Sequence, residues 1–233
     1  MHAAPASKRA EYIFAFDECA SETPFVDWIW RTRSEPVEAF MSVAEPRWEI
    51  VVTRQHGKPM VTIRGAVTAA SSVHIPQDAD FFGMRFALGA FMPGLAAHSL
   101  TDAWHTLPQN GNRFLWLDGD YWETPTFENA DVFIERLRRA GMLTRDPVVE
   151  AALNGERTRL SKRTLQRRIY RAVGISGGAV RQIRRASDAA QFLEEGASIS
   201  ETAARVGYSD PAHMSRSLRR LVGYTPKMLA GES

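Results

Sequence analysis

The chain has 233 residues, enough for one or two domains that each bury a hydrophobic core. Its single cysteine, Cys19, excludes an internal disulfide and is typical of a reducing compartment. No apolar run reaches the roughly 18 residues of a membrane-spanning helix, and the first residues lack the apolar stretch of a signal peptide. We therefore expect a cytoplasmic protein without a membrane partner.

The net charge of +2 averages two unlike parts of the chain. Residues 1–145 carry 14 Lys and Arg against 18 Asp and Glu, whereas residues 146–233 carry 15 against 9. All six tryptophans and 11 of the 12 phenylalanines precede residue 145. A basic surface releases counterions when it neutralises phosphates, so the C-terminal part is suited to a polyanion. The two compositions predict two domains with different roles.

The N-terminal part has the pattern of a β-rich domain. Residues 1–10 are expected to form a loose arm, and residues 11–143 a domain of the barrel or sandwich type. Short β-branched or alternating runs, punctuated by Gly and Pro, predict strands at 48–54, 59–67, 71–76 and 80–88. The four residues from Gln55 to Lys58 predict a hairpin between the first two strands. Segment 91–108 is compatible with either a short helix or a loop.

The helical pattern begins near the end of this domain. An amphipathic helix is predicted over 128–143, with Val132, Phe133, Ile134, Leu137 and Ala140 clustered and Gly141 ending it. We place the domain junction after it, so that residues 144–233 form an all-helical domain. Asp146 and Pro147 predict the N-cap and first position of a short helix over 148–155.

Two segments of the C-terminal part, 161–176 and 210–225, repeat one pattern 49 residues apart. Each begins with a short polar residue that can cap a helix and reaches a glycine suited to a left-handed C-terminal position. Each places apolar residues at i, i+4 and i+7, which makes one helix face to bury. These residues are Leu165, Ile169 and Ala172 in the first copy and Met214, Leu218 and Leu221 in the second.

The segments around the two copies complete a recognisable arrangement. A connector helix is predicted over 177–196, and Ser198 with Glu201 forms the capping box of a short helix over 198–207. A short helix, a glycine-containing turn and a second helix make a helix-turn-helix. A connector of roughly 18 residues spans about 27 Å, near the ~34 Å of one DNA turn. Both basic helices could therefore enter successive major-groove segments.

The outer faces of the two repeated helices carry side chains of the types that contact bases or phosphates in DNA. Arginine pairs with guanine and glutamine with adenine in the major groove, whereas phosphate contacts position the protein without specifying sequence. The base-reading candidates are Arg163, Gln166, Arg167, Ala212, His213 and Arg216. The phosphate candidates are Ser161, Lys162, Arg171, Arg219 and Arg220. For Arg171, Arg184 and Arg185 a solvated helix face explains the charge equally well.

At these residues the chain resembles a known family. Residues 146–229 are similar to the DNA-binding domain of AraC/XylS-type transcriptional regulators, first through LSKRTLQRRIYRAVGIS. The second motif adds Ala203, Gly207-Tyr208, Met214, Arg216, Leu218, Gly223 and Thr225-Pro226. The resemblance implies a double helix-turn-helix that binds double-stranded DNA at promoters and controls transcription. It also allows RNA polymerase, a small-molecule effector and a second copy in a homodimer as partners.

The chain departs from the family pattern in two places. The charged spacer 154–160 precedes the first recognition-like helix, where the family has a scaffold helix and a tight turn. Pro211 and Ala212 stand where family members often have hydrogen-bonding residues. The resemblance therefore leaves the integrity of the first motif open and implies that the second helix reads less sequence.

The family's other domain is commonly a β-rich module that senses a small molecule or mediates dimerisation, and residues 11–128 are similar to it less specifically. Aromatic side chains could line a ligand pocket there, with an ordinary aromatic core as the alternative. The pocket candidates are Trp48, Phe82, Phe86, Trp104 and Trp116.

The competing interpretation is a metal- or ligand-binding β-barrel protein or enzyme. In that case the basic helical part would only be an appendage that tethers the barrel. Its metal ligands would be His74, His98 and His105 with either Asp102 or Asp118. No pair of histidines has H-x-H, H-x₃-H or H-E-x-x-H spacing, and nucleotide, dinucleotide and serine-hydrolase motifs are absent. We therefore expect no catalytic residue, metal site or cofactor. A third interpretation, non-specific nucleic-acid binding, predicts equal affinity for scrambled DNA.

Overall fold

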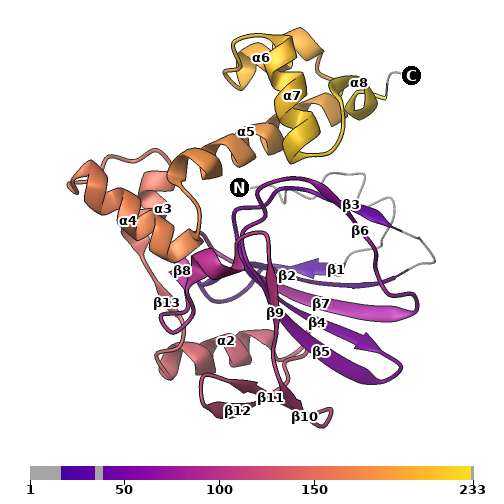
Figure 1. The fold of residues 1–233 in the computed structure, drawn as a ribbon, viewed down its shortest axis with the longest axis vertical. Helices are drawn as coiled ribbons and strands as arrows, with labels where there is room; N and C mark the ends of the chain where they lie inside the picture. Colours follow the sequence, from indigo (N-terminus) through magenta and orange to yellow (C-terminus); the bar gives the residue numbers. More distant parts are fainter. Residues whose placement is uncertain (1–16, 35–38, 232–233) are drawn as a thin grey trace.

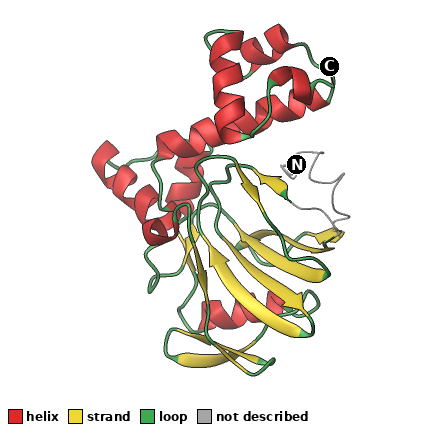
Figure 2. Cartoon of the chain, turned by 45° about the vertical axis from the view of Figure 1, so that its right-hand side comes forward, coloured by secondary structure: helices red, strands yellow, loops and turns green. Residues whose placement is uncertain are grey.

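The computed structural model describes residues 17–34 and 39–231, and the predicted arm 1–10 lies outside the described residues. A β-rich region runs to Arg145, and six helices follow it within the described part of the chain (Figures 1 and 2). This order confirms the predicted fold class, a β-rich N-terminal region followed by a helical C-terminal one.

The largest sheet contains six antiparallel strands. Their spatial order is β1 (Asp17–Cys19), β2 (Val26–Arg33), β7 (Ala79–Phe86), β4 (Glu49–Gln55), β5 (Lys58–Arg64) and β9 (Trp104–Thr106). The predicted hairpin is confirmed, since β4 pairs with β5 and Gln55 lies opposite Lys58. Its two turn residues, His56 and Gly57, have φ of 49° and 74°, which suits a two-residue hairpin turn.

One face of this sheet and α2 (Ala130–Arg139) enclose the N-terminal core. Cross-strand pairing places four fully buried side chains in one row: Ile29, Met84, Ile50 and Ile63. From α2, Ile134 and Leu137 pack into the same core, as its amphipathic pattern predicts. The predicted cluster was wrong at Val132 and Ala140, which are exposed: Val132 lies outside the buried stripe of the helix, and Ala140 is the C-cap residue that follows its last turn.

Three smaller sheets complete the β-rich region. A three-stranded sheet contains β10 (Gln109–Asn110), β11 (Phe114–Leu117) and β12 (Asp120–Glu123), and β3 (Phe40–Ser42) pairs with β6 (Ser71–Val73). In the third, β8 (Ala90–Phe91) pairs with β13 (Thr144–Arg145). The segment 91–108 contains the short 3₁₀ helix η1 (Ala97–Leu100). The β8–β13 pair brings the chain back from α2 to the point where the helical region starts.

The helical region follows the predicted order. It consists of α3 (Pro147–Leu153), α4 (Lys162–Val173), α5 (Gly177–Glu194), α6 (Ile199–Arg205), α7 (Pro211–Leu221) and α8 (Pro226–Leu229). The predicted N-caps are confirmed, since the side chains of Asp146, Ser161, Ser198 and Asp210 each accept a hydrogen bond from the first turn. In Figure 1 the connector α5 joins α4 at one end to α6 and α7 at the other. Across residues 17–34 and 39–231, no helix is long and apolar enough to cross a membrane.

Candidate nucleic-acid interface

The second helix pair, α6 and α7, forms a compact helix-turn-helix. Met214 and Leu218 on α7 are fully buried and belong to the same core cluster as Ala203 on α6. The N–H of His213 donates to Asp210 Oδ1 over 2.7 Å, which fixes the start of α7. This hydrogen bond, followed by one from Ser209, lowers the pKa of the Asp210 carboxyl. The N-terminal end of α7 is thus held in shape while its outer residues stay exposed.

The first pair, α3 and α4, packs together although a longer segment separates its helices. Eight residues, 154–161, lie between α3 and α4, compared with five, 206–210, between α6 and α7. Val149 and Leu153 of α3 nevertheless share one core cluster with Ile169 of α4. The apolar stripes therefore hold the helix pair together despite the charged spacer.

All eleven predicted DNA-contacting residues are exposed. Ser161 caps α4 by accepting a hydrogen bond from the N–H of Thr164 over 3.2 Å. Two arginines also contact their own chain: the Arg171 guanidinium lies 5.1 Å from the centre of the Phe91 ring, and Arg220 donates to Gln182 Oε1 over 3.3 Å. The side chains of Lys162, Arg163, Arg167 and Arg219 make no hydrogen bond or ion pair with any described residue. These four cations are free to meet phosphates or bases.

The C-terminal ends of α4 and α7 both rest on the β-rich region. The backbone N–H groups of Ala70 and Ala44 donate to the carbonyls of Arg220 and Leu221 over 2.8 and 2.7 Å. At the end of α4, Thr101 Oγ1 donates to the carbonyl of Gly174 over 3.3 Å. These bonds satisfy carbonyls that a helix end leaves without partners. The β-rich region thus holds the same end of each helix and leaves the basic outer faces exposed.

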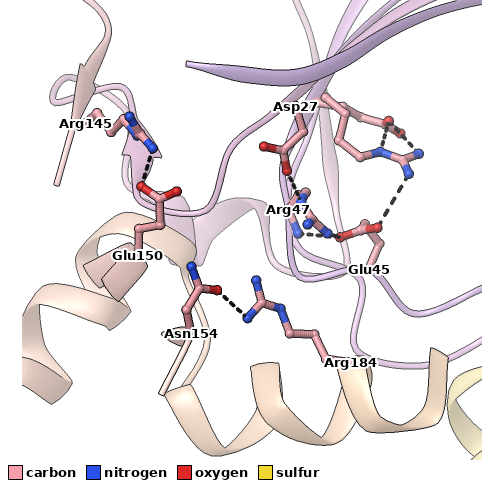
Figure 3. A network of polar contacts seen from close by, with 9 residues as sticks. Asp27, Glu45, Arg47, Arg145, Glu150, Asn154 and Arg184 are labelled. Carbon is pink, nitrogen blue, oxygen red and sulfur yellow. Dashed lines mark hydrogen bonds and ion pairs between the residues drawn. The ribbon is translucent and has the colours of Figure 1, made fainter. Parts of the chain in front are cut away.

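Charged and polar side chains of both regions lie near one another where α5 faces the β-rich region (Figure 3). On α5, Arg184 donates to the carbonyl of Leu153 and to Asn154 Oδ1, so it supports the end of α3. Burial, followed by the positive charge of Arg47, lowers the pKa of Arg184. Arg47 in turn pairs with Asp27 and Glu45, over 2.5 and 3.1 Å.

For two arginines the sequence allowed either a solvated helix face or a contact with phosphate. In the structure both contact other residues of their own chain. Besides Arg184, Arg185 donates to the carbonyl of Gly207 over 3.3 Å and lies 5.2 Å from the centre of the Tyr208 ring. The sequence contained no signal for the contacts of Ala44, Ala70 and Thr101, because these residues meet the helices only in the folded chain.

The structure does not bring the five aromatic pocket candidates together. Trp48 and Phe86 stack at 3.7 Å inside the N-terminal core, and Trp48 Nε1 donates to the carbonyl of Ala90. Phe82 lines a pocket of about 500 Å³, and Trp116 lines a separate one of about 250 Å³. Trp104 is 69% exposed on β9.

Two of the side chains considered for a metal site make other contacts. Asp102 accepts hydrogen bonds from the N–H and the hydroxyl of Thr68, over 2.7 and 2.6 Å. His98 stacks on Tyr170 of α4, with 5.5 Å between the ring centres. Within residues 17–34 and 39–231, no group of three or more His, Cys, Asp or Glu side chains could hold a metal ion.

Residues 155–230 match a protein-family model described as a helix-turn-helix domain. A search of curated proteins found no match. A crystal structure of ToxT from Vibrio cholerae aligns with 10% identity over 93% of this chain and 98% of that chain, with a TM-score of 0.42. ToxT from Vibrio cholerae O395 aligns with 8% identity over 93% and 97% of the two chains, with a TM-score of 0.43.

The matched segment contains both repeated helices, α4 and α7, together with their connector. Each helix has its predicted cap, packs its predicted apolar stripe against the core, with Leu165 only partly buried, and exposes a basic face. The C-terminal part of this chain therefore contains a helix-turn-helix domain, over residues 155–230.

Proposed function

We propose that the protein regulates transcription by inserting α4 and α7 into successive major-groove segments of one promoter site. The observation that carries this proposal is the set of exposed cations without partners on both helices, Lys162, Arg163 and Arg167 on α4 and Arg219 on α7. The connector α5 has 18 residues. At ~1.5 Å per residue it spans about 27 Å, which suits the spacing of adjacent groove segments.

Within this function the exposed residues take different roles. Arg163, Gln166 and Arg167 on α4, with Ala212, His213 and Arg216 on α7, are the proposed base readers. Ser161, Lys162, Arg171, Arg219 and Arg220 are the proposed phosphate contacts. We expect α4 to carry more of the sequence specificity, because Ala212 has no polar group to offer a base.

The β-rich domain, which we keep as residues 11–143, is proposed to modulate DNA binding through a small molecule or through self-association. Its contacts with the ends of α4 and α7 support this role, since a change in either contact would alter how the two helices are spaced. A homodimer and RNA polymerase are further partners that this function allows. Sedimentation with and without promoter DNA would test the first, and transcription in vitro with purified polymerase would test the second.

The experiment that tests the function is selection of duplexes from a random pool, followed by titration of the selected and scrambled duplexes with the full chain. We expect tighter binding to the selected duplex, a footprint on two adjacent major-groove segments, and affinity that falls steeply with salt. Equal affinity for the scrambled duplex would instead support non-specific binding. A footprint restricted to one groove segment would contradict insertion of both helices.

A further inference from the structure

A pocket of about 250 Å³ lies where β5, β9 and the three-stranded sheet meet the loop that follows β8. Its lining includes Ile63, Leu107 and Leu117, all buried, and Met92 and Leu95 from the loop. This apolar lining suits the body of a small organic molecule. Phe82, which lines the larger pocket, takes no part in this site.

The polar groups of this pocket favour one sign of ligand charge. Its lining contains the carboxylate of Asp118 and the imidazole of His105 but no lysine or arginine. The Asp118 carboxylate makes no hydrogen bond or ion pair with any described residue. The Asp118 carboxylate would therefore repel an anionic ligand, because no lysine or arginine of the lining neutralises it. A cationic ligand could instead form an ion pair with it.

The aromatic lining supports the same choice. Trp116 lines the pocket and is 39% exposed, so part of its indole surface remains accessible. Its ring packs edge-on against Tyr121 with the ring centres 4.8 Å apart. An indole face attracts an ammonium group. We propose that this pocket binds a small organic cation, an ammonium group on an apolar body, with Asp118 as its counter-ion.

Two segments that border the pocket continue to the first helix-turn-helix. The loop with Met92 and Leu95 leads into η1, where His98 stacks on Tyr170 and Thr101 bonds the carbonyl of Gly174. Met142 lines the pocket a few residues before Asp146, the N-cap of α3. A ligand that displaces either segment changes the support of α4, whereas α7 rests on Ala44 and Ala70. We therefore assign the pocket a regulatory role, which rests on the proposed function.

Isothermal titration calorimetry of the full chain tests the pocket with two probes of the same shape, 4-phenylbutylammonium and 4-phenylbutyrate. The cation is expected to bind about tenfold or more tightly than the anion, because only the cation pairs with Asp118. Asp118→Asn should remove about the same factor from the affinity for the cation. Asp118 has a φ of 51°, a conformation that asparagine tolerates, so the turn is expected to persist.

Asp120→Asn is the matched control, since Asp120 is exposed in the same hairpin but does not line the pocket. It should leave the affinity for the cation unchanged. Thermal unfolding of both variants checks that they are folded, and Leu95→Trp, which fills the pocket from the loop, should block the cation independently. Absence of heat with the cation, equal binding of both probes, or an unchanged affinity in Asp118→Asn would each overturn the assignment.

A second titration separates this proposal from the proposed function. The affinity for the selected duplex is measured with and without saturating 4-phenylbutylammonium, in the natural chain and in Asp118→Asn. We expect the cation to change the affinity for DNA only in the natural chain. If the chain selects no duplex, the proposed function fails while calorimetry still decides the pocket. If the cation binds but the affinity for DNA stays constant, the regulatory link is overturned.

Discussion

Arg168 on α4 donates from Nε to Oδ2 of Asp146 over 2.6 Å, and the other oxygen of the same carboxylate caps α3. Its Oδ1 accepts from the N–H groups of Val148 and Val149 over 3.1 and 3.3 Å. One side chain thus starts the first helix of the pair and binds the second. This double use explains how α3 and α4 keep a fixed arrangement across the spacer 154–160, together with their shared apolar core.

Replacing Asp146 should therefore destabilise the first helix pair, α3 and α4, by removing two separate interactions. Asp146→Ala removes the cap and the partner of Arg168, and we expect the free energy of unfolding to fall by about 1–3 kcal/mol. Asp146→Asn can keep the cap and should lose less. Urea unfolding followed by circular dichroism measures both. Glu156→Ala, an exposed change in the spacer, is the control, and a loss for Asp146→Ala no larger than for this control would refute the double role.

Two glycines at helix ends allow a test of whether α4 packs against η1 of the β-rich region. Gly174 and Gly196 have φ of 84° and 92°, so alanine is strained at both, by about 1 kcal/mol. A Cβ at Gly174 would also lie 2.6 Å from the carbonyl oxygen of Ala97, whereas nothing lies within 4 Å at Gly196. We expect Gly174→Ala to cost about 1–3 kcal/mol more than Gly196→Ala in thermal unfolding. Equal losses would mean that α4 is not docked on η1 in solution.

Base-reading and phosphate-binding residues should respond differently to substitution. Arg167→Ala is expected to weaken binding by about 1–3 kcal/mol and to relax the preference at one base position. Lys162→Ala should weaken binding to all sequences alike and reduce the dependence of affinity on salt, by about one unit of slope. Fluorescence anisotropy on the selected duplex and on its single-base variants measures both effects.

Arg54→Ala is the charge-matched control for these variants, because Arg54 is exposed on the β-rich domain. It should leave the affinity and its salt dependence nearly unchanged. If Arg167→Ala behaves like Arg54→Ala on every duplex, Arg167 does not read a base.

The start of α7 should respond to acid through Asp210. Hydrogen bonds from the N–H of His213 and from Ser209 lower the pKa of this carboxyl below its ordinary value of 3.8. A carboxyl with a lowered folded pKa stabilises the folded state above its unfolded pKa, and this stabilisation disappears as the pH falls through the folded value. NMR titration should place the midpoint of Asp210 below 3.8. Ser209→Ala should move it upward, and an unchanged midpoint would exclude the hydroxyl as a cause.

The strands show where sequence patterns succeed and where they fail. The β4–β5 hairpin followed from two β-branched runs and a four-residue turn, because those features act between neighbouring residues. The strand β2 was not predicted individually. A register shift between Val26 and Trp28 interrupts its alternation, so Val26 and Ile29 are the buried positions instead of residues two apart.

The sequence by itself determined the helical domain: its caps, its apolar stripes and the repeat of α4 in α7. These features depend on hydrogen bonds and side-chain spacings between residues that are close together in the sequence. Only the tertiary structure decided that Arg184 supports α3, that Trp48 stacks on Phe86, and that Ala44 and Ala70 hold the end of α7. Those contacts join residues far apart in the sequence, so they exist only once the sheet and the helices have packed against each other.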